Sequence, residues 1–389
     1  MKHLMRLPSA YLTLPILLAC GLTLLTYDLP PDYLEGMLLL ASTALAILFF
    51  DLLGGSRLPS VAVFRARQYA GTRESFVALA LAGAIMFFCL LDLTLFPVPL
   101  FAGPSAYANM EGGREHIRHI SDICWVLPPI GLLCTRNKWL RNLLVVVGLA
   151  FPVLVIDRNR LFASLFSTAL VVALRRDEMK PWPWKSVGLL TLAGCGVFSA
   201  LGILRSGSLD TVALPFSAMY RASPVGIQWL LLYASAGPYN FGAMLAKHYS
   251  NASFLIHQLV PMSGSIATAG TDIPLDASNI NVGTEFLPFL MAFGPAGAVA
   301  SIIALYALLL WSVRRLRPAV PLFPLLIFLR MSYVCVMAPF APQAFTWTNA
   351  GFIGVCLVLQ VFAAWFPSRT TSSSVPVATG RATSQPSIP

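Results

Sequence analysis

Apolar runs as long as a membrane-spanning helix recur along almost the whole chain. Most are about 16 to 23 residues long, and roughly 20 helical residues cross a hydrocarbon core about 30 Å thick. The composition agrees, because 57% of the residues are hydrophobic and only 11% are charged, too few for a surface that faces water. A membrane barrel would show short alternating segments instead. The pattern predicts an all-α, polytopic integral membrane protein embedded in the lipid bilayer.

Ten transmembrane helices are predicted from these runs. They cover residues 9–27, 34–53, 74–96, 119–134, 140–156, 161–174, 186–204, 284–312, 320–338 and 346–366. The first is expected to be an uncleaved helix because its apolar run continues past Cys20, although Leu-Leu-Ala-Cys resembles a lipoprotein cleavage site. Residues 1–366 are therefore interpreted as one membrane domain. Residues 367–389 form a Ser/Thr/Pro-rich tail that is too polar to fold.

Basic residues between the predicted spans set the orientation. Lys and Arg gather on the cytoplasmic side of membrane proteins, and here they occupy alternate loops, at 54–73, 135–141, 175–185 and 314–317. This alternation predicts that both termini are cytoplasmic. It also explains much of the formal net charge of +10, so that charge does not indicate a nucleic-acid partner.

The largest non-spanning piece is the segment 205–283, on the predicted outer side. Within it, residues 224–246 are apolar enough to enter the membrane, yet another full span there would place the C-terminal basic loops outside. A re-entrant or interfacial helix satisfies both observations. Residues 248–283 are rich in Ser, Asn, Gly and Thr, so this part is either a ligand-facing loop or an ordinary solvated loop.

Several arginines lie outside the predicted cytoplasmic loops. The hairpin from Leu143 to Leu174 is shorter than the roughly 40 residues that two full spans need. Arg158 and Arg160 at its tip should therefore lie at or below the outer headgroups, where a charge is expected to face a protein cavity.

Three further arginines have competing explanations. Arg330 lies inside an apolar span, so it either pairs with a carboxylate such as Asp92 or points into the same cavity. Arg205 and Arg221 follow the seventh span, where they either bind lipid headgroups or join the cavity. Guanidinium groups offer forked donors that match phosphate oxygens, so this set suits a lipid-linked pyrophosphate. The expected substrate-binding residues are Arg158, Arg160, Arg205, Arg221 and Arg330.

The outer segments also contain residues able to act as a general base. The candidates are His248, His257, Asp272 and Glu285, of which one at most would act, and no spacing singles one out. His116 and His119 lie three residues apart without an HExxH pattern, so neither a metal nor a cofactor is expected. The seven cysteines lie in or beside apolar runs and are expected to be free thiols.

Three stretches carry a recognisable pattern. They are Asp157-Arg-Asn-Arg-Leu-Phe-Ala-Ser-Leu, Leu232-Tyr-Ala-Ser-Ala-Gly-Pro-Tyr-Asn-Phe241, and Ser278-Asn-Ile-Asn-Val-Gly-Thr-Glu-Phe with the following PFLMAFGPAGA. Together with the number of spans and the long outer segment, they resemble the oligosaccharide repeat-unit polymerases, the Wzy-type O-antigen polymerases of bacterial inner membranes.

This resemblance implies a glycosyltransferase of polysaccharide and lipopolysaccharide biosynthesis. Such an enzyme moves a glycan chain from undecaprenyl pyrophosphate onto a lipid-linked repeat unit at the periplasmic face of the cell inner membrane. It implies that Arg158 or Arg160 contacts the anionic carrier, that no metal is used, and it allows a chain-length regulator as a partner. No residue here matches a catalytic base of the family.

Two other functions fit the same features. An O-antigen ligase, which transfers a finished glycan to a lipid A core, would share the architecture and should place a catalytic His in the long outer loop. A flippase or transporter of lipid-linked oligosaccharide would be expected to show internal repeats, and none is detected. Its charges would also line a path through both leaflets, whereas most of these arginines lie on the outer side.

Overall fold

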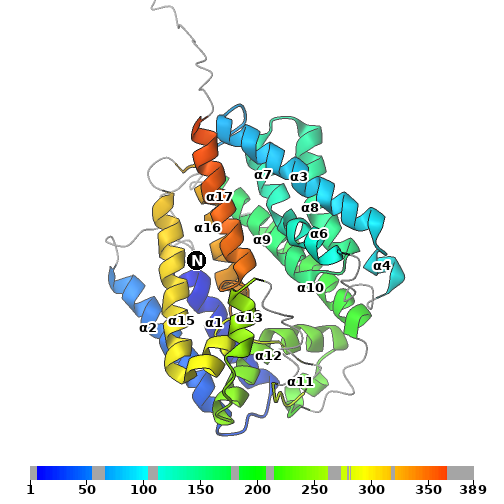
Figure 1. Ribbon diagram of the computed structural model, residues 1–389. Helices are drawn as coiled ribbons and strands as arrows, with labels where there is room; N and C mark the ends of the chain where they lie inside the picture. Colours follow the sequence, from blue (N-terminus) through cyan, green and yellow to red (C-terminus); the bar gives the residue numbers. More distant parts are fainter. Residues whose placement is uncertain are drawn as a thin grey trace, which may run out of the picture.

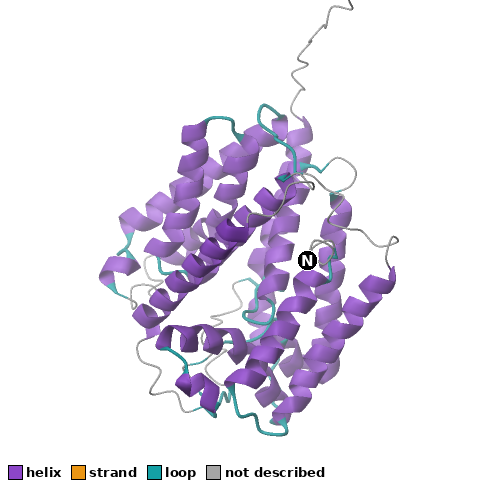
Figure 2. Ribbon diagram, turned by 180° about the vertical axis from the view of Figure 1, so that it is seen from behind, coloured by secondary structure: helices purple, strands orange, loops and turns teal. Residues whose placement is uncertain are grey.

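The computed structural model describes residues 7–54, 66–103, 113–176, 184–206, 214–261, 273–277, 280, 282–316 and 320–365. Within these ranges the protein is helical and contains no strand (Figure 2), apart from an isolated bridge between Tyr27 and Phe216. The predicted all-α class is confirmed. The predicted tail at 367–389 lies outside the described residues.

Figure 1 shows the helices coloured along the chain. In chain order they are α1 (Ala10–Thr26), α2 (Tyr33–Gly54), α3 (Arg73–Leu95), α4 (Pro99–Ala102), α6 (Arg114–Ser121), the 3-10 helix η4 (Asp122–Val126), α7 (Leu127–Cys134), α8 (Lys138–Leu154), α9 (Arg158–Arg175), α10 (Trp184–Ser206), α11 (Ala218–Ala222), α12 (Val225–Ala246), α13 (Ser253–Leu259), α15 (Leu287–Arg315), α16 (Leu322–Met337) and α17 (Trp347–Trp365).

Five stretches of the described chain are long and apolar enough to cross a membrane. They are Tyr33–Gly54, Arg73–Ala102, Arg114–Cys134, Leu287–Arg315 and Trp347–Trp365. Helices α1 and α16 are apolar but shorter, and α9 begins with two arginines and ends with another. The structure is that of a helical membrane protein with five candidate spans by length and composition. The larger predicted number stays a prediction.

Long-range hydrogen bonds gather the predicted cytoplasmic loops at one end of the helical bundle. The N–H of Ala66 donates to the Leu174 carbonyl, and the N–H of Tyr69 donates to the Leu133 carbonyl. The Tyr69 hydroxyl donates to the Val320 carbonyl at 2.5 Å. The chain before α3 therefore contacts the ends of α7 and α9 and the chain before α16. The alternation of basic loops in the sequence corresponds to one physical end of the molecule.

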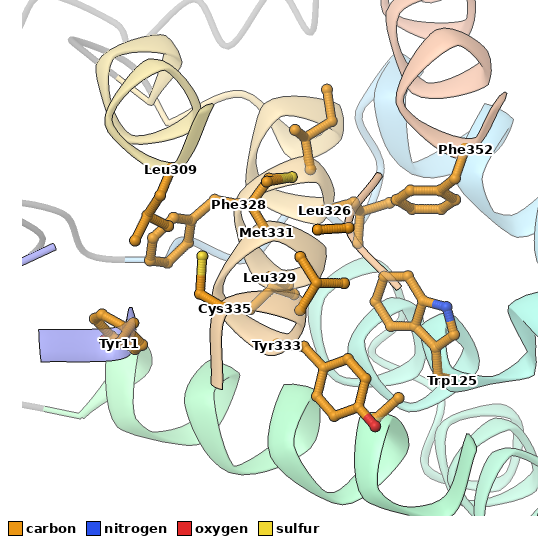
Figure 3. Packing of buried hydrophobic residues seen from close by; sticks show 14 of the residues in the cluster. Tyr11, Trp125, Leu309, Leu326, Phe328, Leu329, Met331, Tyr333, Cys335 and Phe352 are labelled. Atoms are coloured by element: carbon orange, nitrogen blue, oxygen red, sulfur yellow. The ribbon is translucent and has the colours of Figure 1, made fainter. Parts of the chain in front are cut away.

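Helix α16 lies at the centre of the core and is buried nearly all round. Every residue from Leu322 to Leu329 is buried, and side chains leave the helix in all directions (Figure 3). The Phe328 ring lies 6.2 Å from that of Tyr11 on α1, while α9, α15 and α17 pack on the other sides. A helix enclosed in this way by apolar neighbours needs no polar face.

Helix α12 crosses the bundle at the end where α1 finishes and α2 begins (Figure 1). Thr23, near the end of α1, donates through its hydroxyl to the Ser235 carbonyl at 3.0 Å. The crossing with α2 is closer still, because a Cβ built on Gly36 would lie 2.6 Å from the Cα of Gly242. This part of the sequence is the one predicted to form a re-entrant or interfacial helix.

We expect Gly36→Ala to destabilise the protein, because the added methyl group would meet backbone of α12 that cannot move independently. Overpacking of this kind costs about 1–3 kcal/mol. Gly83→Ala on α3 is the matched control, since nothing lies within 4 Å of the methyl group it would add. Thermal unfolding of the purified proteins in one detergent compares them. Equal melting temperatures for the two variants would contradict the close crossing.

Candidate functional site

A cavity of about 750 Å³ lies between α9, α10, α12 and α16, with the loops 282–283 and 340–343 completing its wall. The first residues of α9 line it, whereas the last residues of α9 lie at the end of the bundle that carries the basic loops. The part of the cavity at the start of α9 therefore lies toward the opposite end of the molecule.

The lining is polar at one end and apolar along its length. The residues at the polar end are Asp157, Arg158, Asn159, Tyr233, Tyr333 and Gln343, and Thr191 of α10 adds one hydroxyl elsewhere in the lining. From there Phe162, Phe166 and Ala169 follow one another along α9 at spacings that place them on one face of a helix. Val336 and Met337 of α16 also line the cavity. The space has the shape and chemistry to hold an amphiphile, with its polar head at the start of α9.

Asp157 determines where α9 begins. It is the N-cap residue, and its side chain accepts the N–H of Arg160 at 3.1 Å, which satisfies one of the free donors of the first turn. Its second oxygen lies 3.0 Å from Nε of Arg160. The carboxylate therefore both starts the helix and neutralises a neighbouring cation. The N-terminus of a helix favours anions.

Arg158 is placed at the junction between the polar and apolar parts of the cavity. It is only 8% exposed, and its Nη2 donates to the Tyr233 hydroxyl at 2.8 Å. Its guanidinium carbon lies 4.3 Å from the centroid of the same ring, a cation–π distance. Helix α12 thus holds a forked cationic donor against the cavity.

Arg160 occupies a different environment. It forms ion pairs with Asp157 and with Asp122 of η4, and it does not line the cavity. The resemblance implied that either Arg158 or Arg160 contacts an anionic carrier, and of these two Arg158 is the one at the cavity.

Arg330 does not pair with Asp92, the carboxylate that the sequence offered as an example. Asp92 is buried and lies 3.1 Å from Nε of Arg114 and 3.8 Å from Nε of Arg118. Arg330 instead donates from Nε to the Asn349 side-chain oxygen at 3.0 Å, and it interacts electrostatically with the buried carboxylate of Glu285. It does not line the cavity. The sequence shows that Arg330 needs a partner, and the fold supplies an amide together with the charge of Glu285.

The other expected ligands lie away from the cavity lining. Arg221 is exposed on α11, His248 is exposed just after α12, and His257 is half-buried on α13. The side chain of Arg205 and the whole of Asp272 lie outside the described residues. The structure therefore does not bring Arg221, His248 or His257 together with Arg158 in the cavity lining.

Glu285 is fully buried and holds a loop in place. Its carboxylate accepts the backbone N–H groups of Gln343, Ala344 and Phe345, the last two at 2.7 and 2.9 Å. Its own N–H donates to the Ala338 carbonyl. This geometry ties the start of α15 to the loop that forms one wall of the cavity, and it places the carboxylate behind that wall.

Four residues at the polar end of the cavity were not singled out by the sequence analysis: Asn159, Tyr233, Tyr333 and Gln343. Asn159 and Tyr233 fall inside two of the stretches that carry the resemblance, and that position was the available signal. Tyr333 and Gln343 gave none, because their part in the cavity depends on contacts with α9 at sequence separations of 174 and 184 residues. All seven cysteines are free thiols, as predicted.

A polar cluster fixes part of the long outer segment. Asp276 accepts hydrogen bonds from the hydroxyls of Tyr33 and Tyr239, each at 2.8 Å, and from the Lys247 ammonium group at 2.6 Å. Burial raises the pKa of Asp276, but hydrogen bonds from the ammonium group and the two phenols outweigh it, so the pKa lies below its ordinary value. The cluster joins residues 273–277 to α2 and α12.

No protein-family model, curated protein or solved structure matches the chain. Within the described residues, no three His, Cys, Asp or Glu side chains gather as a metal site would require. The functional assignment therefore rests on the cavity and its lining.

We expect Arg160→Ala to lower stability strongly. The substitution removes the cation from a buried carboxylate, a change that costs about 3–5 kcal/mol. Arg136→Ala, in the exposed loop before α8, should change stability by less than about 0.5 kcal/mol. Chemical unfolding of both variants in detergent checks this. A chemical unfolding curve for Arg160→Ala that overlays the curve of the control would refute the ion pairs of Arg160.

We expect Asp276→Asn to destabilise the protein in a pH-dependent way. Because the folded-state pKa lies below the unfolded value of about 3.9, the contribution of Asp276 is complete above that value and is lost as pH falls through the folded-state pKa. The melting temperatures of wild type and variant should therefore differ at neutral pH and converge below about pH 4. Thermal unfolding across this range tests it, with exposed Asp32→Asn as the control. A difference in melting temperature that stays the same at low pH would contradict the stabilising role of the polar cluster around Asp276.

Proposed function

We propose that the chain is a polysaccharide polymerase of the O-antigen type. It would transfer a glycan chain from undecaprenyl pyrophosphate to a lipid-linked repeat unit. The observation that carries the proposal is the amphiphilic cavity, with Arg158 at its polar end and an apolar stripe of α9 along its length. A lipid-linked diphosphate has the same division into an anionic head and an apolar tail.

The head of such a donor would meet three kinds of group. The Arg158 guanidinium offers two parallel N–H donors to phosphate oxygens. The first turn of α9 presents its N-terminus, where the helix dipole favours negative charge. The Tyr233 hydroxyl already accepts from Arg158 and holds its direction.

The tail would follow the apolar wall. Phe162, Leu165, Phe166 and Ala169 of α9 face Cys195 of α10 across the cavity. Helix α10 packs chiefly on α12, and its exposed apolar residues, Leu189 and Leu192 among them, would face lipid. An isoprenoid chain that moves from the lipid bilayer into the cavity exchanges one apolar environment for another. The polar head would therefore provide most of the selectivity for the ligand.

The proposal includes a membrane topology. About ten spans, cytoplasmic termini and a bacterial inner-membrane location follow from the sequence pattern, with α12 as the interfacial helix of the long periplasmic segment. The gathering of the basic loops at one end supports this arrangement, since the polar part of the cavity, at the start of α9, lies toward the other end. The donor would then be bound from the periplasmic side.

In the transfer, an acceptor hydroxyl would attack the anomeric carbon of the donor sugar. The bond between that carbon and the pyrophosphate oxygen breaks, the electron pair leaves with the pyrophosphate, and the hydroxyl proton passes to a base. Arg158 would stabilise the negative charge that develops on the leaving oxygen. His248, His257 and Glu285 lie off the cavity lining, so the proposal assigns the donor side of the reaction.

The test is complementation of a deletion strain, read as the ladder of polymerised glycan on a gel. We expect wild type and Arg136→Ala to restore the ladder. Arg158→Ala should leave a single-repeat band, with polymer reduced about 100-fold, as for loss of a charge-stabilising donor. Arg158→Lys should restore it only in part, because an ammonium group lacks the forked donors.

Each other pattern has a distinct meaning. Loss of every glycan band in the deletion strain would indicate a ligase or a flippase. A deletion strain with an unchanged ladder would exclude the polymerase. A full ladder from Arg158→Ala, in protein present at the wild-type level, would remove this arginine from the site.

A further inference from the structure

Asn159 is exposed in the cavity although its neighbours in sequence are buried. Asp157, Arg158 and Arg160 are each less than 9% exposed. Asn159, in contrast, is exposed and lines the cavity beside Arg158. It is the second residue of α9. The side-chain amide of Asn159 is therefore accessible at the polar end of the cavity, and its position as the second residue of a helix does not by itself require an amide there.

The acceptor side of this amide is fully engaged. Gln343 donates from Nε2 to the Asn159 side-chain oxygen at 2.8 Å. The Tyr333 hydroxyl contacts the same oxygen and lies 2.7 Å from the Asn159 backbone carbonyl. The Nδ2 group has no hydrogen-bond partner among the described residues. Its two N–H donors are therefore held on the side turned away from Gln343 and Tyr333.

The partners of Asn159 are themselves held rigidly. The Tyr333 ring belongs to the core around α16, with its hydroxyl directed away from the apolar side chains (Figure 3). The backbone of Gln343 is fixed by the buried carboxylate of Glu285. A chain of contacts thus runs from the start of α15 through the loop after α16 to the head of α9, and it ends on one amide.

We infer that Asn159 is a phosphate-binding residue, whose amide donors act with the Arg158 guanidinium on the two phosphates of a lipid-linked diphosphate. Tyr333 and Gln343 are the positioning residues that orient its amide. This inference rests on the proposed function and specifies its substrate. Two donor groups at adjacent positions match two phosphates better than one, so the site should distinguish a diphosphate from a monophosphate.

The test uses the full-length protein in nanodiscs, with farnesyl diphosphate and farnesyl monophosphate as probes. We expect wild type to bind the diphosphate more tightly. Asn159→Ala should weaken diphosphate binding about tenfold, the usual effect of losing a hydrogen bond to a charged group. Asn159→Asp should weaken it further, because it places a negative charge beside the anion.

Asn159→Ala separates ligand binding from a structural role when the two probes are compared. If Asn159 merely holds Gln343 and Tyr333, Asn159→Ala will weaken binding of the diphosphate and of the monophosphate by the same factor, which would overturn the inference. Asn159→Asp keeps the oxygen that accepts from Gln343 and Tyr333 but replaces the N–H donors by a negative charge. Asn142→Asp, at an exposed position on α8, is the control for the added net charge.

Two further results complete the test. Tyr333→Phe leaves Asn159 unchanged but frees its amide, so we expect a several-fold loss of diphosphate over monophosphate selectivity. That variant decides the matter if Asn159→Asp does not fold, because unaltered selectivity would overturn the inference. Wild type that binds neither probe would overturn the proposed lipid-diphosphate site as well, whereas wild-type binding with unaffected variants would overturn the role of Asn159 alone.

Discussion

Charge that is buried in an apolar bundle must be neutralised by a partner, and this requirement organises the part of the molecule that holds the cavity. Asp92 receives Arg114 and Arg118 between α3 and α6. Asp157 receives Arg160 and at the same time caps α9. Arg160 also pairs with Asp122, so these interactions fix α6 on α3 and the start of α9 next to η4. Only on that fixed frame does the first turn of α9 present a cation and an amide to the cavity.

The same requirement explains why Glu285 lies where it does. A carboxylate at the start of a long apolar helix looks, from the sequence, like a residue available for acid–base chemistry. In the fold it is enclosed and its oxygens accept three backbone N–H groups from the loop 343–345. These three residues lie in the connection between α16 and α17, which contains Pro339 and Pro342 and is not helical at this point. Glu285 accepts their N–H groups and thereby shapes one wall of the cavity.

The cavity combines two structural features that arise separately. Its apolar length is a stripe of α9, produced by residues spaced three and four apart, and α10 closes it from across the cavity. Its polar head comes from four elements: α9, α12, α16 and the loop after α16. A site assembled in this way binds the head of an amphiphile through hydrogen-bond donors and binds its tail through apolar contacts that exclude water. These two interactions contribute to affinity independently.

The sequence by itself determined the all-α class, the free thiols, the loops that share one end and the presence of a cavity-facing arginine at the start of α9. These properties depend on local composition and on helix length, which neighbouring residues set. The tertiary structure decided which arginine faces the cavity, that Arg330 contacts Asn349 and not Asp92, and that Tyr233 and Gln343 belong to the site. Those choices depend on partners that lie 75 and 184 positions away from α9 residues in the chain. No local pattern encodes them, because they follow from how separate helices pack.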